Sequence, residues 1–194
     1  MDNGATWDSI LGDIGLIGNV VDIFAEGDTI FASIWGNEGY LIRSLDNGQT
    51  WAQVYATEHA AEYIADIIMH NGNLYIGKVG YFANMGGVYK SPDAGETWEY
   101  IGLKKHMVSS LAFNSSNDLI AGIRGGDLDS IVPGIYALRN GSQVWEMLNV
   151  EAFVNDMVVN QQDDIVASLS FPVGVIISTD DGASFEYINS GLPP

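Results

Sequence analysis

The octapeptide SLDNGQTW at residues 44–51 decides the fold, because it returns twice at a fixed distance along the chain. The second copy is SPDAGETW at 91–98, and the third is STDDGASF at 178–185. A shortened copy, DNGATW, lies near the start of the chain at 2–7, and a degenerate copy, RNGSQVW, occupies 139–145. The five closing aromatic residues are spaced by 44, 47, 47 and 40 positions. A fixed period of about 45 residues is typical of a repeat architecture built from one recurring supersecondary unit.

Each unit has the same internal order of apolar segments and turns. Alternating apolar segments bounded by Gly, Asn and Asp predict strands, and the best helical candidate, 56–63, covers only one or two turns. Four short antiparallel strands in a unit of about 45 residues are typical of a propeller blade. The sequence therefore predicts an all-β protein, a single β-propeller domain over 1–194, with 1–19 as a partial repeat that holds an orphan strand. The four full blades are expected at about 20–54, 63–101, 107–148 and 153–189.

The pattern S/T-x-D-x-G-x-T/S-aromatic in the three full copies resembles the Asp-box, or BNR repeat. This repeat occurs in sialidases, sortilin-type receptors, certain xyloglucanases and the photosystem II assembly factor family. The resemblance implies a propeller whose boxes lie at the blade periphery, on the face away from the usual ligand site. It implies no single function, because the motif recurs in proteins with unrelated activities.

The chemistry of the box predicts a structural role for its defined residues. The aspartate can accept hydrogen bonds from nearby backbone N–H groups, the glycine can take a positive φ, and the Thr or Ser hydroxyl can close the hairpin. The aromatic ring is then expected to pack under the turn. This structural set comprises Asp46, Gly48, Trp51, Asp93, Gly95, Trp98, Asp180, Gly182 and Phe185.

Composition excludes several classes of function. Seven basic and 25 acidic residues leave a formal charge of −18, which argues against binding nucleic acid through a basic patch. The absence of cysteine excludes thiol catalysis and cysteine-ligated metals. No apolar run approaches the roughly 18 to 20 residues that span a bilayer, so no membrane insertion is expected. A secreted or cell-surface location is favoured, although the chain carries no signal peptide.

Strand order sorts the connecting loops onto two faces of the propeller. The boxes share one face with the turns between first and second strands, and the more variable loops between second and third strands share the other. Aromatic residues on loops held by a rigid scaffold favour a binding surface for a protein or a carbohydrate. The alternative is that these rings pack over the blade rims. The predicted ligand-binding set is Trp35, Tyr81, Phe82, Asp127, Asp129 and Phe171.

Three carboxylates recur at equivalent positions of the innermost strands. Asp22, Asp66 and Asp156 share this position with Ser110, and near the axis they would repel one another unless they were hydrated or held a cation. Calcium or another divalent cation would be the ion bound there. The alternative is a water-filled channel whose carboxylates hydrogen-bond to neighbouring strands. No other cofactor is expected.

The function favoured by these observations is a non-catalytic binding or assembly scaffold. The alternative is a glycoside hydrolase fragment, similar to a sialidase or a xyloglucanase, with a carboxylate pair drawn from Glu38, Asp127, Asp129 and Glu151. The resemblance to sialidases would require three arginines at the substrate carboxylate. The chain has only three arginines, and two of them, Arg43 and Arg139, fall in or beside box positions. This placement argues against three arginines converging on one site.

The strand count predicts an assembly larger than one chain. The last unit already has its own fourth strand, so the orphan strand at the start is not needed to complete that blade. An open arc of blades would expose two apolar faces, which water disfavours. The chain is therefore expected to form a homo-oligomer or to be part of a longer propeller.

Overall fold

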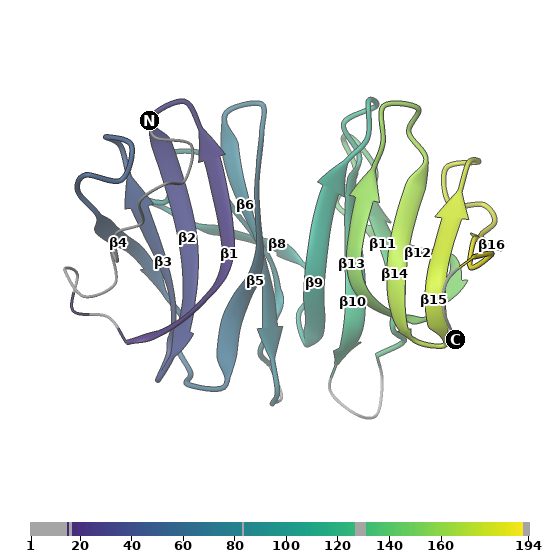
Figure 1. Cartoon of the computed structure of the whole chain (residues 1–194), viewed down its shortest axis with the longest axis horizontal. Helices are drawn as coiled ribbons and strands as arrows, with labels where there is room; N and C mark the ends of the chain where they lie inside the picture. The colour runs from purple at the N-terminus through teal and green to yellow at the C-terminus, as the bar shows by residue number, and fades with distance from the viewer. Residues whose placement is uncertain (1–14, 16, 83, 127–130, 192–194) are drawn as a thin grey trace.

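A computed structural model of the chain describes residue 15 and residues 17–82, 84–126 and 131–191. Sixteen strands account for the regular structure of this part, which contains no helix. They form four sheets of four strands, ordered β1-β2-β3-β4, β5-β6-β7-β8, β12-β11-β10-β9 and β13-β14-β15-β16 (Figure 1). Every neighbouring pair is antiparallel. These sheets are the four propeller blades that the repeat predicts, so the predicted fold class is confirmed; the predicted orphan strand lies outside the described residues.

The blades follow one another along the chain without exchange of strands. Blade 1 contains β1 (Gly18–Glu26), β2 (Thr29–Gly36), β3 (Gly39–Ser44) and β4 (Ala52–Ala56). Blade 2 contains β5 (Glu62–His70), β6 (Asn73–Gly80), β7 (Gly87–Ser91) and β8 (Glu99–Gly102). Blade 3 contains β9 (His106–Phe113), β10 (Leu119–Gly126), β11 (Gly134–Leu138) and β12 (Trp145–Glu151). Blade 4 contains β13 (Phe153–Val159), β14 (Ile165–Phe171), β15 (Val173–Ser178) and β16 (Glu186–Tyr187).

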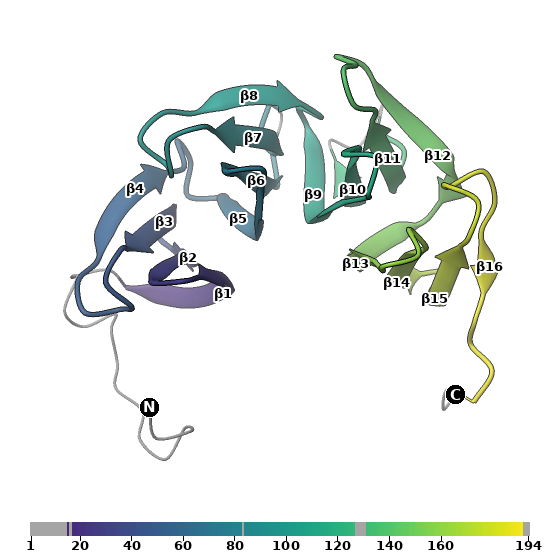
Figure 2. The same ribbon diagram turned by 90° about the horizontal axis from the view of Figure 1, so that it is seen from above.

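The blades stand side by side in an open arc, with the first strand of each blade on the inside (Figure 2). Strands β4, β8, β12 and β16 lie on the outside of the same arc. The two end blades do not meet, and β1 and β13 lie apart in both views (Figures 1 and 2). Within the described residues, the propeller is therefore an open arc.

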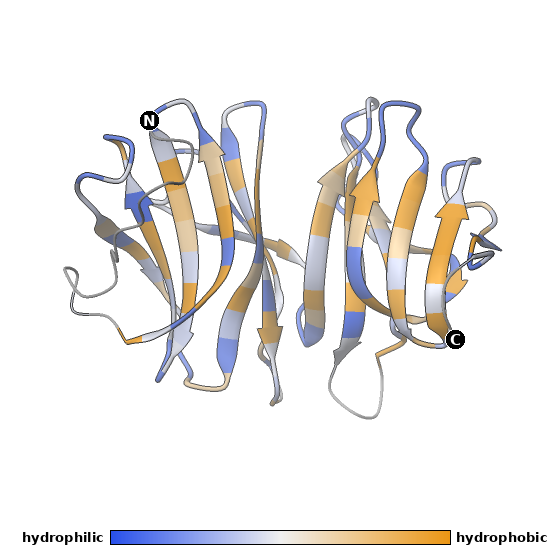
Figure 3. Cartoon of the chain, in the orientation of Figure 1, coloured by the Kyte–Doolittle hydropathy of each residue, from blue (hydrophilic) through white to orange (hydrophobic). Residues whose placement is uncertain are grey.

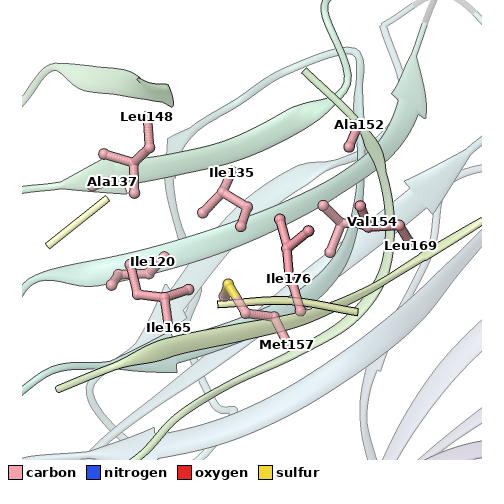
Figure 4. Packing of buried hydrophobic residues seen from close by; sticks show 11 residues of the cluster. Ile120, Ile135, Ala137, Leu148, Ala152, Val154, Met157, Ile165, Leu169 and Ile176 are labelled. Atoms are coloured by element: carbon pink, nitrogen blue, oxygen red, sulfur yellow. The ribbon is translucent and has the colours of Figure 1, made fainter. Parts of the chain in front are cut away.

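The apolar core lies between neighbouring blades. Apolar residues recur along the strands of every blade (Figure 3), and consecutive residues of β2, β6 and β10 are buried, so both faces of these strands lie in apolar surroundings. Between blades 3 and 4, for example, Ile120 and Ile135 pack with Val154, Ile165 and Ile176, all at most 1% exposed (Figure 4). Neighbouring blades thus bury the faces that a single blade would expose.

Each repeat turn, at residues 44–51, 91–98 and 178–185, is closed by its own aspartate. Asp46 Oδ1 accepts the N–H of Thr50 at 2.8 Å, and Asp46 Oδ2 accepts the Thr50 hydroxyl at 2.6 Å. Gly48 has a φ of +85°, as the sequence predicts, and Asn47 before it also has a positive φ, of 57°. The Trp51 indole donates to the carbonyl of Gly48 at 3.0 Å, so the ring lies against the turn.

Candidate functional site

Three described connections share the loop face, which lies at the opposite ends of the strands from the repeat turns. They are the β2–β3, β6–β7 and β14–β15 connections, at the lower edge of Figure 1. Antiparallel strand order fixes this division, because the β1–β2 and β3–β4 turns of each blade must return at the other edge. The loop face is therefore where the predicted ligand residues are to be found.

An aromatic ladder crosses the loop face between blades 1 and 2. Trp35 of β2 stacks on Tyr63 of β5, with ring centroids 4.9 Å apart and planes inclined by 29°. Tyr63 in turn lies 6.5 Å from the ring of Tyr81, just beyond β6. Tyr63 is buried, while Trp35 and Tyr81 are 37% and 51% exposed. We call these three residues the aromatic ladder; its two outer rings face solvent, and its middle ring is held in the blade interface.

A buried ion pair includes Glu62, the residue directly before Tyr63 of the ladder. Lys78 Nζ lies 3.0 Å from Glu62 Oε1, and both side chains are only 4% exposed. The ammonium also donates to the Tyr55 hydroxyl at 3.0 Å and lies 4.2 Å from the centroid of the Tyr89 ring. Such a pair compensates its desolvation only with additional hydrogen bonds and close geometry, both of which are present.

The same ion pair fixes the loop that carries the outer ring. Glu62 Oε1 accepts the backbone N–H of Gly86 at 2.8 Å, so the carboxylate ties the start of β5 to the β6–β7 connection. An added Cβ at Gly86 would lie 2.1 Å from the carbonyl oxygen of His106, and Gly86 has a φ of +79°. Glycine is therefore required at this point of the loop. The N–H of Tyr81 itself donates to the carbonyl of Ala61 at 3.3 Å, which ties Tyr81 to the segment that leads into β5.

Arg124 of β10 adds a positive charge near the ladder. Burial raises the pKa of the Tyr63 hydroxyl and the neighbouring Tyr81 raises it further, whereas the nearby Arg124 guanidinium lowers it. Tyr63 and Arg124 were both missed as site residues by the sequence interpretation. The position of Tyr63 at the end of the link between blades 1 and 2 was the one signal in the sequence that pointed to it.

A hollow of about 470 Å³ lies beside Trp35. Its described lining consists of Ile17, Gly18, Asn19, Trp35, Gly36 and Asn37. The two amide side chains supply donors and acceptors next to an aromatic and an aliphatic surface. This combination suits a ligand with both apolar and hydroxyl or amide groups.

The remaining predicted ligand residues do not join this group. Phe82 follows Tyr81 and is 66% exposed. Phe171 is 70% exposed and lies on blade 4, where its ring makes an edge contact with Phe153 at 6.3 Å. Asp127 and Asp129 lie outside the described residues. The structure thus brings Trp35 and Tyr81 together through Tyr63 and places Phe171 in a separate pair.

The inner-strand carboxylates have hydrogen-bond partners on a neighbouring blade, which are backbone N–H groups for Asp22 and Asp66 and the Ser110 hydroxyl, at 3.1 Å, for Asp156. Asp22 Oδ2 accepts the N–H of Ile67 at 2.8 Å, and Asp66 Oδ2 accepts the N–H of Leu111. These contacts correspond to the hydrogen-bonded alternative that the sequence left open. Burial, opposed by these hydrogen bonds, raises the pKa of Asp66 to about 7, and the charge of Asp22 adds to the rise.

No set of three potential metal ligands comes together within the part of the chain that the structure describes. Asp22, Asp66 and Asp156, predicted as cation ligands, thus do not form a three-ligand group here. The carboxylates considered for hydrolysis are also separated, since Glu38 lies on blade 1 and Glu151 ends β12 of blade 3. No described helix is long and apolar enough to cross a membrane.

Comparison with known proteins identifies the fold. No family model matches the sequence, and no curated protein sequence matches it. Among solved structures, YCF48 bound to a D1 peptide is similar at a TM-score of 0.56 and 13% identity, over 87% of this chain and 52% of that chain. The GH74 xyloglucanase of Xanthomonas campestris is similar at a TM-score of 0.61 and 15% identity, over 83% of this chain and 28% of that chain.

A third similar structure comes from a protein complex. The nidogen/laminin complex contains a chain that matches at a TM-score of 0.63 and 14% identity, over 82% of this chain and 58% of that chain. All three identities are too low to carry an activity across, and this chain spans about half or less of the YCF48 and xyloglucanase chains. Fold and comparisons together define the class: the chain is a β-propeller protein.

Proposed function

We propose that this chain is a non-catalytic binding scaffold whose aromatic ladder receives a protein segment or a carbohydrate. The observation that carries the proposal is the stack of the partly exposed Trp35 ring on the buried Tyr63 ring. Exposed rings that are already fixed lose little conformational entropy when a ligand stacks on them. Similar structures that were solved with a D1 peptide and as a nidogen/laminin complex support a binding role in this class of fold.

We also propose that the repeat turns are Asp-boxes and that residues 1–194 form one propeller unit. The hydrogen bonds of Asp46, Asp93 and Asp180 all run within their own turns and support an architectural role for these carboxylates. The hydrolase alternative gains no specific support, because the described carboxylates of the loop face are not paired. A GH74 enzyme shares only the fold with this chain.

The test is binding of immobilised glycans and peptides to the purified chain, followed by calorimetric titration of each probe that binds. Changing Trp35 or Tyr81 to Ala is expected to weaken binding at least tenfold, since truncating a central aromatic anchor commonly costs about 2 kcal/mol or more. The matched control is Leu45→Ala, which truncates a 60% exposed side chain in a repeat turn on the opposite face.

Three results would contradict the proposal. Unchanged affinity in both aromatic variants would place the ligand elsewhere, and unfolding of both variants would make the rings part of the core. Release of reducing sugar from a bound glucan would replace the scaffold with the hydrolase. The kind of probe that binds, a glycan or a peptide, decides whether the ligand is a carbohydrate or a protein segment.

A further inference from the structure

Two of the three described interfaces between blades are closed at the outer rim of the arc by a repeat turn (Figure 2). Between blades 1 and 2, the turn of blade 2 lies against β4, since a Cβ added at Gly95 would lie 2.9 Å from Cγ2 of Val54. Between blades 3 and 4, a Cβ added at Gly182 would clash with the side chain of Leu148 in β12. Both glycines are buried. Each of these turns therefore packs directly on the outer strand of the blade before it.

An arginine holds each of these two turns in place. Arg43 at the end of β3 donates to the Ala94 carbonyl at 2.9 Å and pairs with Glu96 at 2.8 Å. Arg139, directly after β11, donates to the Asp181 carboxylate at 2.6 Å and to the Asp181 carbonyl at 3.4 Å. Ala94 and Asp181 are the fourth residues of their turns, so both guanidinium groups reach the same backbone position. The two interfaces thus share one closing contact.

The interface between blades 2 and 3 lacks the packed turn. Trp145, which ends the degenerate turn at 139–145, still donates to the Ile101 carbonyl of β8 at 2.9 Å. Ser142 precedes Trp145 by three positions, as Gly95 and Gly182 precede their own aromatic residues, but Ser142 is exposed. The middle of this turn therefore does not pack on β8.

Lys90 of β7 occupies the position of Arg43 but does not hold the next turn. Lys90 is paired with Tyr75 in the sheet, as Arg43 is with Phe31, and its ammonium lies 5.8 Å from the centroid of the Tyr75 ring. Among the described residues, Lys90 takes part in no ion pair. Glu99 lies directly opposite Lys90 on β8, and these two side chains are not paired with each other either. A cationic donor and an anionic acceptor thus lie side by side without a shared partner.

A groove lies where the turn does not pack. Two adjoining hollows, of about 260 and 440 Å³, share the lining residues Glu99, Ile101, Leu138 and Ser142. Lys90 lines the first hollow, while Tyr100, which is 44% exposed, and Gln143 line the second. We call the two hollows together the rim groove. Polar side chains beside the apolar residues Ile101 and Leu138, in a space of this size, are typical of a small-molecule site.

We propose that the rim groove binds a neutral oligosaccharide, at a site separate from the aromatic ladder. A hydroxyl group both accepts and donates a hydrogen bond, so one sugar hydroxyl satisfies Lys90, which only donates, and Glu99, which only accepts. The exposed ring of Tyr100 supplies a flat apolar surface for the C–H face of a sugar ring. Gln143 adds an amide that can donate and accept.

Charge and backbone geometry favour this ligand over a protein segment. An acidic segment would meet the formal charge of −18, and a basic one would place like charge beside Lys90. An extended segment would have to pair with the outer edge of β8. The Trp145 indole already occupies the Ile101 carbonyl on that strand. A neutral ligand that binds through hydroxyl groups meets none of these obstacles.

The experiment titrates the 194-residue chain with neutral trisaccharides of glucose, mannose, galactose and xylose, and with uncharged peptides of similar mass. The Trp145 indole N–H is the reporter, because it is bonded to Ile101 in the lining of the groove. Its signal in a proton–nitrogen NMR spectrum is expected to shift with at least one saccharide. The concentration dependence of that shift gives the affinity.

Variants on two blades locate the ligand. Tyr100→Ala and Glu99→Ala should each weaken binding about tenfold or more, whereas Tyr100→Phe should keep the affinity because the ring remains. The matched controls are Tyr187→Ala and Glu186→Ala, since Glu186 and Tyr187 begin the outer strand of blade 4 as Glu99 and Tyr100 begin that of blade 2. Both controls should leave the affinity unchanged.

Two further variants separate the groove from the ladder and from loss of folding. Trp35→Ala should not change this affinity, so failure of the ladder proposal would leave the groove intact. Gln143→Ala tests the groove if Tyr100→Ala does not fold, with Gln49→Ala as its control at the equivalent position of the first repeat turn.

Four results would overturn the proposal. If no saccharide shifts the Trp145 signal at millimolar concentration, the groove is not a saccharide site. If only peptides shift the signal, the occupant is a protein segment. Equal losses of affinity in Tyr187→Ala and Tyr100→Ala would mean that binding does not depend on the groove. Loss of binding in Trp35→Ala, with full binding in Tyr100→Ala, would assign the saccharide to the aromatic ladder.

Discussion

The serine that opens each repeat turn contributes more than the sequence pattern indicates. Ser91 is fully buried, and its hydroxyl donates to Asp93 Oδ1 at 2.8 Å while it accepts the N–H of Gly95 at 2.8 Å. The aspartate then accepts both the N–H and the hydroxyl of Thr97, which lowers the pKa of Asp93. The serine and the aspartate therefore act as one hydrogen-bonded unit.

Replacing Ser91 by Ala is expected to lower the free energy of unfolding by about 1 to 3 kcal/mol, because a buried N–H loses its acceptor. Urea unfolding followed by fluorescence measures the change. Ser116→Ala is the matched control: Ser116 is exposed, and its hydroxyl has no partner among the described residues. Equal stability of the two variants would show that the serine is dispensable.

Asp93→Ala should also lower the free energy of unfolding, without affecting ligand affinity. The loss should be larger than for Asp93→Asn, which removes the same charge.

The sequence predicts the role of these turns better than it predicts the ladder. Aspartate, glycine and an aromatic residue at fixed offsets describe a local structure, and local chemistry is visible in sequence. The stack of Trp35 on Tyr63 joins residues from two different blades, so no local pattern encodes it. The buried Glu62–Lys78 pair is equally invisible, since charged residues in a strand usually face solvent.

At the scale of the element, the inner strands link folding to pH. The pKa of Asp66 rises from 3.8 to about 7 in the folded chain, chiefly through burial, and that of Asp22 also rises. The folded state therefore binds a proton more tightly than the unfolded state does. The resulting stabilisation is fully present below about pH 4 and is lost as the pH rises through 7.

Asp66→Asn should accordingly flatten the decline of unfolding free energy between pH 5 and pH 8. Urea titrations of both proteins at constant ionic strength provide the comparison. The pKa of His106 is lowered by burial, which acts in the opposite sense below pH 6.5, but this contribution is common to both proteins and cancels in their difference. Parallel pH profiles for the two proteins would show that Asp66 is not the group responsible.

The strand order was accessible from the sequence because a meander pairs neighbours along the chain. The four predicted first strands correspond to β1, β5, β9 and β13. The bulge in each of them was not predictable from alternation alone, because it inserts one residue and shifts the period. That shift is what turns Asp22, Asp66 and Asp156 into links between blades, where the sequence suggested cation ligands.

At the scale of the whole molecule, the formal charge of −18 acts against folding. Repulsion among like charges destabilises a compact state. Salt screens this repulsion between charges farther apart than about 30 Å at 0.01 M and about 10 Å at 0.1 M ionic strength. Raising NaCl from 0.01 to 0.3 M is therefore expected to raise the thermal midpoint by several degrees.

Calcium chloride separates screening from specific binding. At matched ionic strength it should stabilise the chain no more than NaCl does, because no three-ligand group is present in the described ranges. A clearly larger effect of calcium, saturating at low concentration, would instead reveal a bound ion.

The hydrogen bonds between inner strands of neighbouring blades also make the arc a linear array in which each blade is protected by its neighbours. Amide protons would then exchange with deuterium slowest in β5 and β9, which have a described blade on both sides, and faster in β1 and β13, which have one among the described residues. The N–H of Leu111, which is bonded to Asp66 of the blade before it, should therefore exchange more slowly than the N–H of Ile23, whose side chain is 62% exposed. The difference between these two amide protons reports how much protection a neighbouring blade gives.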